Sequence, residues 1–407
     1  MNRGRGAACL AAVCVWMPAG VSAAAWVADP SLEWTSGVDD NYGLAFDRRN
    51  RVGYASMTGG LIASRETENT ATRLNAGLVG LLLRGDLHQG EWQDNFALSH
   101  SVKGPVDDVL VDAKTSRDET LQTPATSADL LIGRGLQRSM SADASWDHEL
   151  TPRLSTSTSL AVTRQRYSGS LAGAHDYQNT TGSASLRYRL DERDSVNANV
   201  VHQDYRTLDD GVREFTDSLT LGGTRAMSET SNASVSLGAY RSRSKVLQPL
   251  FACPGNAASC DSGDVIVVEQ VGHEARWGVQ YNASYGGQLS ERTRFDASAM
   301  RQQDPSGAGV TVLGDTLRAS LDHSYSETLQ GTLAYTRSSS RYLGFANQSS
   351  RLQTLAAQAS KQLSPQLTLR VNADWRRSAL AFDGLRAHDV AVSVTLRYEW
   401  QRLEAHH

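Results

Sequence analysis

Two cysteines offer the most specific chemistry in the body of the chain. Cys253 and Cys260 have six residues between them in a polar stretch. In an exported protein, which passes through an oxidising compartment, a disulfide is the expected state of such a pair. A metal site is the alternative, but the loop contains no histidine and the chain has no second cysteine pair; His273 is the nearest histidine downstream. The pair therefore predicts a stapled extracellular loop, and the sequence predicts neither a metal nor a cofactor.

Histidine and serine could together support hydrolysis, in which a base activates a nucleophile held within hydrogen-bond reach. Eight histidines are scattered singly along the body of the chain: His88, His100, His148, His175, His202, His273, His323 and His388. Neither a Gly-x-Ser-x-Gly nor a His-Glu-x-x-His sequence occurs. The acidic stretch 261–264 lacks the further ligands of a calcium loop. We predict no catalytic residues and keep a hydrolase at the rim of the fold only as the weaker alternative.

The last long segment of the chain indicates what kind of element carries the side chains. From Asp389 to Trp400, apolar and polar residues alternate strictly. The apolar set after Val390 is Val392, Val394, Leu396, Tyr398 and Trp400. A strand with one apolar and one polar face suits a wall that has lipid on one side and water on the other. The same alternation recurs along most of the chain, for example over residues 367–376, so this pattern predicts an all-β protein.

Bulk composition narrows the class further. The chain has 407 residues, 40% of them hydrophobic, and a mean hydropathy of −0.40. The longest uncharged apolar run in the body, Ala76 to Leu83, is far shorter than the roughly 20 residues of a membrane helix. No linker or shift in composition divides the chain. Many polar residues and few aromatics would make a poor packed core, but they suit a barrel whose interior holds water.

The chain ends are expected to lie outside this fold. Arg3 and Arg5, the apolar stretch Ala7–Met17 and the small residues before position 24 together describe a cleaved secretory signal over residues 1–23. Residues 24–400 would form a single barrel, and residues 401–407 a short unstructured tail. Removing the two arginines takes the formal charge from −4 to about −6. That balance argues against nucleic acid as a partner.

Hairpins recur along the chain with a regular rhythm. Tight polar turns lie near residues 151, 191, 229, 291, 327 and 365, and five of the six are followed by a clearly alternating segment. Longer polar gaps separate the hairpins. A propeller would carry four short buried strands per repeat, whereas each unit here has two long amphipathic ones. We predict a transmembrane antiparallel up-and-down β-barrel of about 18 strands, with sixteen as the rival count. The first strand is placed at 33–46. Short turns would be periplasmic and longer loops extracellular.

Aromatic residues are expected to mark the two lipid headgroup levels. Those beside the short turns or the chain end are Trp146, Tyr188, Tyr325, Tyr398 and Trp400. Those beside the longer gaps are Tyr167, Tyr205, Tyr240 and Tyr342. This distribution predicts two outward girdles.

Charged residues on the polar sides of the strands are the candidates for function. Those assigned to the lumen are Arg187, Arg189, Arg370, Asp374, Arg376, Arg397 and Glu399. Mixed charge in a wide pore would orient polar solutes and set a weak ion preference. Equally, such charges could simply pair across strands and rigidify the wall. Loops that fold inward would constrict the pore, and the gaps Val246–Val268 and Gln122–Gly135 are the candidates.

A family resemblance accompanies these patterns. The turns 190–193 and 289–292, Asp118-Glu119-Thr120 after an early strand and the hairpin opening at 141–150 resemble the porin-like outer-membrane β-barrels of proteobacteria. The resemblance covers most of the chain and lies in the general pattern of strands and turns, not in a fixed motif. It implies the outer membrane of a Gram-negative bacterium, no enzymatic activity, and an association with exopolysaccharide export and exosortase systems. Expected partners are outer-membrane lipid and lipopolysaccharide, the barrel insertion machinery, and polysaccharide export components.

The sequence therefore predicts a passive or polymer-guiding channel linked to exopolysaccharide export. The alternative is a structural or assembly barrel that holds a partner of a secretion or polysaccharide system and conducts little.

Overall fold

The computed structural model describes most of the chain between residues 25 and 405. The described ranges are 25–44, 49–87, 89–119, 135–169, 174–209, 211–252, 266–307, 309, 311–342, 349–380, 385–400 and 403–405. The predicted signal, both cysteines of the predicted disulfide and all of the gap Gln122–Gly135 except its last residue lie outside these residues. No helix among the described residues is long and apolar enough to cross a membrane.

Eighteen long strands make up the wall, and a nineteenth short one follows. Their bounds are β1 Trp26–Asp39, β2 Val52–Glu66, β3 Thr70–Gly85, β4 Gln89–Lys103, β5 Asp107–Glu119, β6 Gly135–Thr151, β7 Leu154–Gly169, β8 Tyr177–Arg189, β9 Asp194–Thr207, β10 Val212–Ser228, β11 Ser231–Ala252, β12 Ile266–Ser290, β13 Thr293–Pro305, β14 Thr311–Ser324, β15 Leu329–Tyr342, β16 Ser349–Ser364, β17 Leu367–Leu380, β18 Arg386–Glu399 and β19 Leu403–Ala405.

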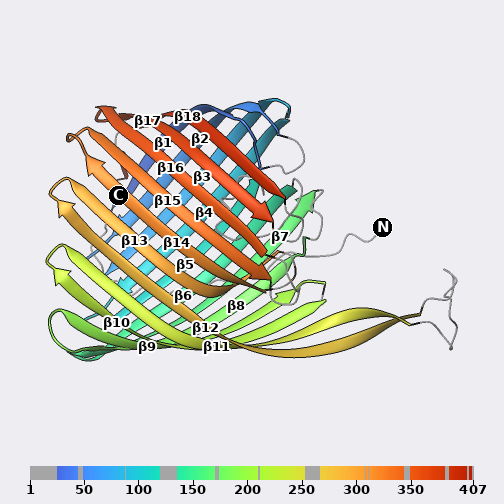
Figure 1. The fold of residues 1–407 in the computed structure, drawn as a ribbon. Coiled ribbons are helices and arrows are strands. Elements are labelled where there is room, and N and C mark those ends of the chain that lie inside the picture. Colours follow the sequence, from blue (N-terminus) through green and yellow to red (C-terminus); the bar gives the residue numbers. More distant parts are fainter. Residues whose placement is uncertain are drawn as a thin grey trace.

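The sheet closes on itself through its first and last long strands. Each long strand pairs antiparallel with the next in sequence, and β1 pairs with both β2 and β18. The seam between β1 and β18 runs in register from Ser31 opposite Glu399 to Asp39 opposite Ala391. Closure pairs the first long strand with the last, so the wall itself has no free edge strand, which is the condition for a sheet to stand in lipid (Figure 1). The predicted antiparallel barrel is thus confirmed, with eighteen wall strands rather than sixteen.

The two rims of the barrel differ in their connections. Turns of two to four residues join β2 to β3, β4 to β5 and every later even strand to its successor, and we call their side the short-turn rim. The opposite side is the long-loop rim. β1 begins and β18 ends at the short-turn rim, so both ends of the wall lie there. The tail expected to be unstructured contributes β19, which pairs with β1 from Trp26 to Ala28 and lengthens the seam.

The first strand lies seven residues earlier than its predicted start. It ends at Asp39 because the chain turns away immediately afterwards, with Gly43 and Leu44 both at positive φ (81° and 52°). This segment folds into the barrel. There Tyr42 packs with Val52, Leu81 and Leu83 in a small buried apolar cluster. The cluster explains why β3 breaks the alternation at this point, since leucines occur on both of its faces.

The hairpin of β11 and β12 is the longest in the molecule. Its strands remain paired out to Ala252 opposite Ile266. Figure 1 shows this hairpin running beyond the long-loop rim and away from the barrel. Residues 246–252 and 266–268, at the two ends of the gap Val246–Val268, are strand and run away from the barrel, so these parts do not fold inward as predicted. Residues 253–265 lie outside the described residues. A continuous ladder satisfies the backbone of both strands without any contact to the rest of the wall.

Candidate functional site: the lumen and its lining

The inner face of the wall can be assigned from contacts that cross the lumen. The Tyr205 hydroxyl on β9 donates to the carbonyl oxygen of Ser306, four strands away after β13, at 2.8 Å. Only a lumen-facing side chain can reach that far. Because residues directly opposite each other in a sheet share a face, the register then fixes the facing of the other strands.

All seven charged residues assigned to the lumen from sequence lie on inward positions. Arg370 makes an ion pair with Glu33 on β1 at 3.6 Å. Arg397 pairs with Glu399 on its own strand at 2.8 Å. Asp374 shares the inner face of β17 with Arg370 and Arg376. Arg187 and Arg189, near the short-turn end of β8, are exposed there. Whether these charges set ion preference stays a prediction.

Arg376 holds together the long-loop end of the seam. Its guanidinium donates to Asp39 at 2.9 Å and also to Asp389, and both carboxylates are buried. The backbone N–H of Asn41 donates to Asp39 at 2.9 Å, and the Asn41 side chain donates to the carbonyl oxygen of His388 at 3.0 Å. Strands β17, β18 and β1 are thereby tied at one point.

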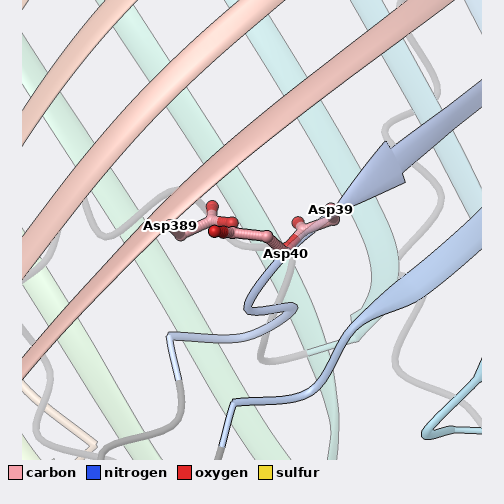
Figure 2. Close-up of side chains that lie close together, drawn as sticks. All are labelled: Asp39, Asp40 and Asp389. Atoms are coloured by element: carbon pink, nitrogen blue, oxygen red, sulfur yellow. The ribbon is translucent and has the colours of Figure 1, made fainter.

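Asp40 completes a group of three carboxylates at this point. Figure 2 shows Asp39, Asp40 and Asp389 converging, with their ligand-capable atoms all within 4.8 Å of one another. Such a group could hold a cation. However, Arg376 already bridges two of the carboxylates, and the third accepts the backbone N–H of Val390 at 2.7 Å. The arginine thus occupies the place of a cation, and the group acts as a structural clasp of the seam.

A second sector of the lining carries acidic residues without partners. On β5 and β6, Asp112 lies directly opposite Asp143, and Asp108 directly opposite Asp147. None of these four takes part in an ion pair with a described residue. Lys114 lies further along the same face of β5. Like charges placed directly opposite destabilise a sheet, so this acidic strip has an energetic cost. Lys103 on β4 lies directly opposite Asp108, so four carboxylates and two lysines share this part of the lining, and one side of the lumen has an excess of negative charge.

The turn between β13 and β14 crosses part of the lumen. Besides accepting from Tyr205 through Ser306, it is fixed by Thr311, whose hydroxyl donates to Glu214 on β10 at 2.7 Å. The backbone N–H of His175 donates to the carbonyl oxygen of Gly307 at 2.7 Å. This turn and the segment after β1 are the described parts of the chain that fold inward, and most of the two gaps predicted to do so lies outside the described residues.

The inward turn rests on tyrosines that were predicted to form the long-loop girdle. Tyr205 and Tyr240 are buried inside the barrel, and Tyr177 packs between Tyr167 and Tyr205 with ring centroids 6.5 and 5.3 Å apart. The prediction that Tyr167, Tyr205 and Tyr240 face lipid is therefore wrong, and the side chain of Tyr342 lies outside the described residues. The alternation of residues along β9 could have predicted the inward position of Tyr205, because Tyr205 lies on the same face of the strand as the polar residues Gln203 and Asn199.

A niche in the lining lies beside this turn. It has a volume of about 440 Å³ between β8 and β13. Amide side chains dominate its lining, with Asn179, Asn199, Gln203, Gln280 and Asn282 among them. The Gln203 amide donates to the Asn179 carbonyl oxygen at 2.9 Å. Side-chain amides both donate and accept, so such a surface matches neutral groups with paired donors and acceptors.

Histidines do not form a catalytic arrangement within the described part of the chain. His100 contacts the Thr72 hydroxyl at 2.8 Å, and His323 contacts the Thr293 hydroxyl at 2.9 Å. His148, His175 and His202 instead contact aspartates. No described histidine contacts both a hydroxyl and a carboxylate, which is the geometry that a Ser-His-Asp type of site requires.

The outer face of the wall is apolar, whereas the lining of the lumen is polar. The residues exposed on the outer face include Val392, Val394, Leu396 and Tyr398 of β18, Trp400 directly after β18, and Trp34, Leu78, Leu221 and Leu237. A continuous apolar surface on a closed antiparallel wall with a polar lining defines a porin-like transmembrane β-barrel. Bacterial barrels of this kind lie in the outer membrane.

No family model matches the sequence, and no curated protein matches it. Among solved structures, the chain is similar to the outer membrane protein OpdK from Pseudomonas aeruginosa, at 12% identity and a TM-score of 0.45, covering 92% of this chain and 99% of that one. It is similar to OpdQ of the same organism at 10% identity and 0.47, covering 94% and 98%. For OccAB3 of Acinetobacter baumannii the values are 9% and 0.46, covering 92% and 99%.

Proposed function

We propose that this protein is a passive diffusion channel for small hydrophilic solutes in the outer membrane of a Gram-negative bacterium. The observation that carries the proposal is the closed wall of eighteen strands with a polar lining. Barrels of sixteen to eighteen strands enclose an aqueous channel unless loops fill it. The inward turn after β13 contacts strands β9 and β10 and so covers one sector of the lumen.

The acidic strip supports a preference for cations. An excess of carboxylates over lysines along a water-filled pore raises the local concentration of cations and lowers that of anions. The opposing arginines of the seam are bound to Asp39, Asp389, Glu33 and Glu399 and contribute little free positive charge. Arg187 and Arg189 also face the lumen, at the short-turn end of β8, so the preference for cations that we propose is weak and local to the acidic strip.

Conductance in planar bilayers tests the channel. Purified protein is expected to give steady open steps of nanosiemens size, as expected of a pore of this strand number. A silent bilayer from correctly folded, heat-modifiable protein would instead favour the structural or assembly barrel.

The reversal potential in a salt gradient tests the cation preference. Replacing Asp108, Asp112, Asp143 and Asp147 by asparagine is expected to move it towards zero. As a matched control, Asp204→Asn with Asp217→Asn removes two carboxylates that face outward, and it should leave the reversal potential unchanged. A preference that survives the lumen substitutions would contradict the assignment of the strip.

The finer proposal concerns the solute. The amide-rich niche supports a neutral polyhydroxylated solute, because side-chain amides can bond adjacent hydroxyl groups in pairs. This agrees with the passage of a polysaccharide and with export components as partners. A neutral oligosaccharide added to one chamber should interrupt the open current, and Asn179→Ala with Asn199→Ala should shorten the interruptions. Interruptions of equal length in both proteins would exclude the niche as the binding site.

A further inference from the structure

On the outward face of β9 to β12, apolar residues give way to charged ones at a single level. Val200, Leu219, Ala239 and Val279 form one cross-strand row of the apolar surface. The next row towards the long-loop rim is His202, Asp217, Arg241 and Trp277. Above it come Asp204, Phe215 and Arg243, and then Arg206, Arg213 and Lys245. The boundary between apolar and charged residues therefore lies at the same level on adjacent strands.

These upper rows form what we call the basic patch: Arg206, Arg213, Arg241, Arg243 and Lys245 with Asp204 and Asp217. Arg213 makes two hydrogen bonds to Asp204, at 3.1 and 2.7 Å, and Arg243 donates to Asp217 at 2.8 Å. Arg206 bonds only the neutral Gln178, and Arg241 lies over the Trp277 ring at 5.3 Å. Among the described residues, Arg206, Arg241 and Lys245 have no ion pair. The patch thus carries three uncompensated positive charges on a surface that faces the membrane.

The other rim lacks this feature on the same strands. There the outward cation is Arg225, and it is paired with Asp194 at 3.7 Å. Its neighbours on the outer face, Met227 and Leu289, are exposed and apolar. The excess positive charge is therefore confined to the long-loop side, which in barrels of this class faces the cell exterior.

We propose that the basic patch binds the phosphate groups of lipopolysaccharide in the outer leaflet. The guanidinium groups lie just above the apolar rows, at the level where a lipid headgroup meets its acyl chains. Arginine can bond a phosphate with two parallel N–H donors, and such pairs are stronger where water is partly excluded. Arg206 and Lys245, in one row and two strands apart, are separated by about 10 Å along the wall. The exposed Trp277 ring marks the boundary between headgroup and acyl chain.

Native mass spectrometry of the full barrel in detergent tests the proposal, with bisphosphorylated lipid A and its dephosphorylated form as the probes. The patch variant carries Arg206→Gln, Arg241→Gln and Lys245→Gln. The control variant carries Arg65→Gln, Arg225→Gln and Lys361→Gln, which removes the same charge from the outer face at the short-turn rim. Heat-modifiable migration on a gel establishes that each variant is folded.

The patch variant is expected to bind bisphosphorylated lipid A at least about tenfold more weakly than the wild type, since charge-assisted pairs are lost. The control variant should bind it like the wild type, and the dephosphorylated lipid should bind all three proteins weakly. Equal binding by the patch and control variants would overturn the proposal. So would competition by millimolar inorganic phosphate, which would indicate a site for soluble phosphate. Conductance is independent of this outcome, because the patch lies outside the lumen.

Discussion

At the scale of single residues, Gly37 on β1 shows how closely the wall is packed against its lining. A Cβ atom at this position would lie 2.7 Å from the Tyr54 hydroxyl and 2.5 Å from the carbonyl oxygen of Val392. We expect Gly37→Ala to lower the free energy of unfolding by about 1–3 kcal/mol, as overpacking does. Urea unfolding of the barrel in lipid vesicles measures this.

Gly182 provides the matched control for that substitution. Nothing lies within 4 Å of a Cβ built there. Gly182→Ala should leave stability unchanged or raise it by about 0.4–1 kcal/mol, through a smaller entropy of the unfolded chain. Equal losses for both variants would mean that the close approach at Gly37 is not the cause.

Asp209, in the connection after β9, carries a pH dependence of its own. Hydrogen bonds from Thr207, His175 and the backbone of Gly211 lower the pKa of its carboxyl from 3.8 to about 2. A group with a depressed folded-state pKa contributes stability above its unfolded pKa and loses it as the pH falls through the folded value. The stabilisation is thus complete above about pH 4 and lost towards pH 2.

Unfolding of wild type and Asp209→Asn across this range tests the assignment. The difference in stability between the two proteins should be constant from pH 7 to about pH 5 and should shrink between pH 4 and 2. A difference that does not change over this lower window would show that the carboxylate is not held by these hydrogen bonds.

At the scale of elements, the seam depends on one arginine. Arg376→Gln leaves the buried carboxylates of Asp39 and Asp389 without their cation, so we expect it to destabilise the barrel by about 3–5 kcal/mol. The partly exposed pair of Arg370 and Glu33, at 3.6 Å, provides the comparison. Arg370→Gln should cost less than about 1 kcal/mol. The urea concentrations at the unfolding midpoints of the two variants test this expectation. Equal midpoints would contradict the proposal that Arg376 stabilises the seam.

The carboxylates of the acidic strip are expected to lower the stability of the barrel and to increase its preference for cations. Asp112 and Asp143 are directly opposite, so Asp112→Asn relieves a repulsion and is expected to raise the free energy of unfolding by roughly 0.2–1 kcal/mol. The same change should weaken the cation preference. Loss of stability on this substitution would mean that the carboxylate has a partner that stabilises it.

Strands could be predicted from sequence because one face had to meet lipid and the other water. The alternation set the register of β17 and β18, and the six polar turns located twelve strand ends to within a few residues. The alternation did not predict the structure correctly where the chain turns into the barrel or where both faces of a strand are apolar. Residues 40–44 were assigned to a strand although Gly43 and Leu44 turn the chain inward, and the leucines of β3 obscured the alternation because both faces are apolar there. Contacts across the lumen, such as Arg376 with Asp39, join residues 337 positions apart and leave no local pattern.

At the scale of the whole molecule, the described part of the lining divides the lumen into sectors of different character. The seam sector is neutralised by ion pairs, the strip on β5 and β6 is acidic, and the sector from β9 to β14 is covered by the inward turn. In the proposed channel, solutes would pass along the acidic strip. The fold itself is compatible with any of these linings, because side chains on inward positions do not contribute to the contact with lipid.

The inward turn after β13 should limit the conductance. Tyr205→Phe removes the donor to Ser306, and Glu214→Ala removes the acceptor for Thr311, while the backbone bond from His175 to Gly307 stays in place. We expect the double variant to show noisier and larger open steps in planar bilayers, by less than about twofold because the turn covers only one sector. Tyr188→Phe, which removes an outward hydroxyl at the short-turn rim, should conduct like the wild type. If the double variant folds and conducts identically to the wild type, the turn does not narrow the path, and the current must pass entirely along the opposite wall.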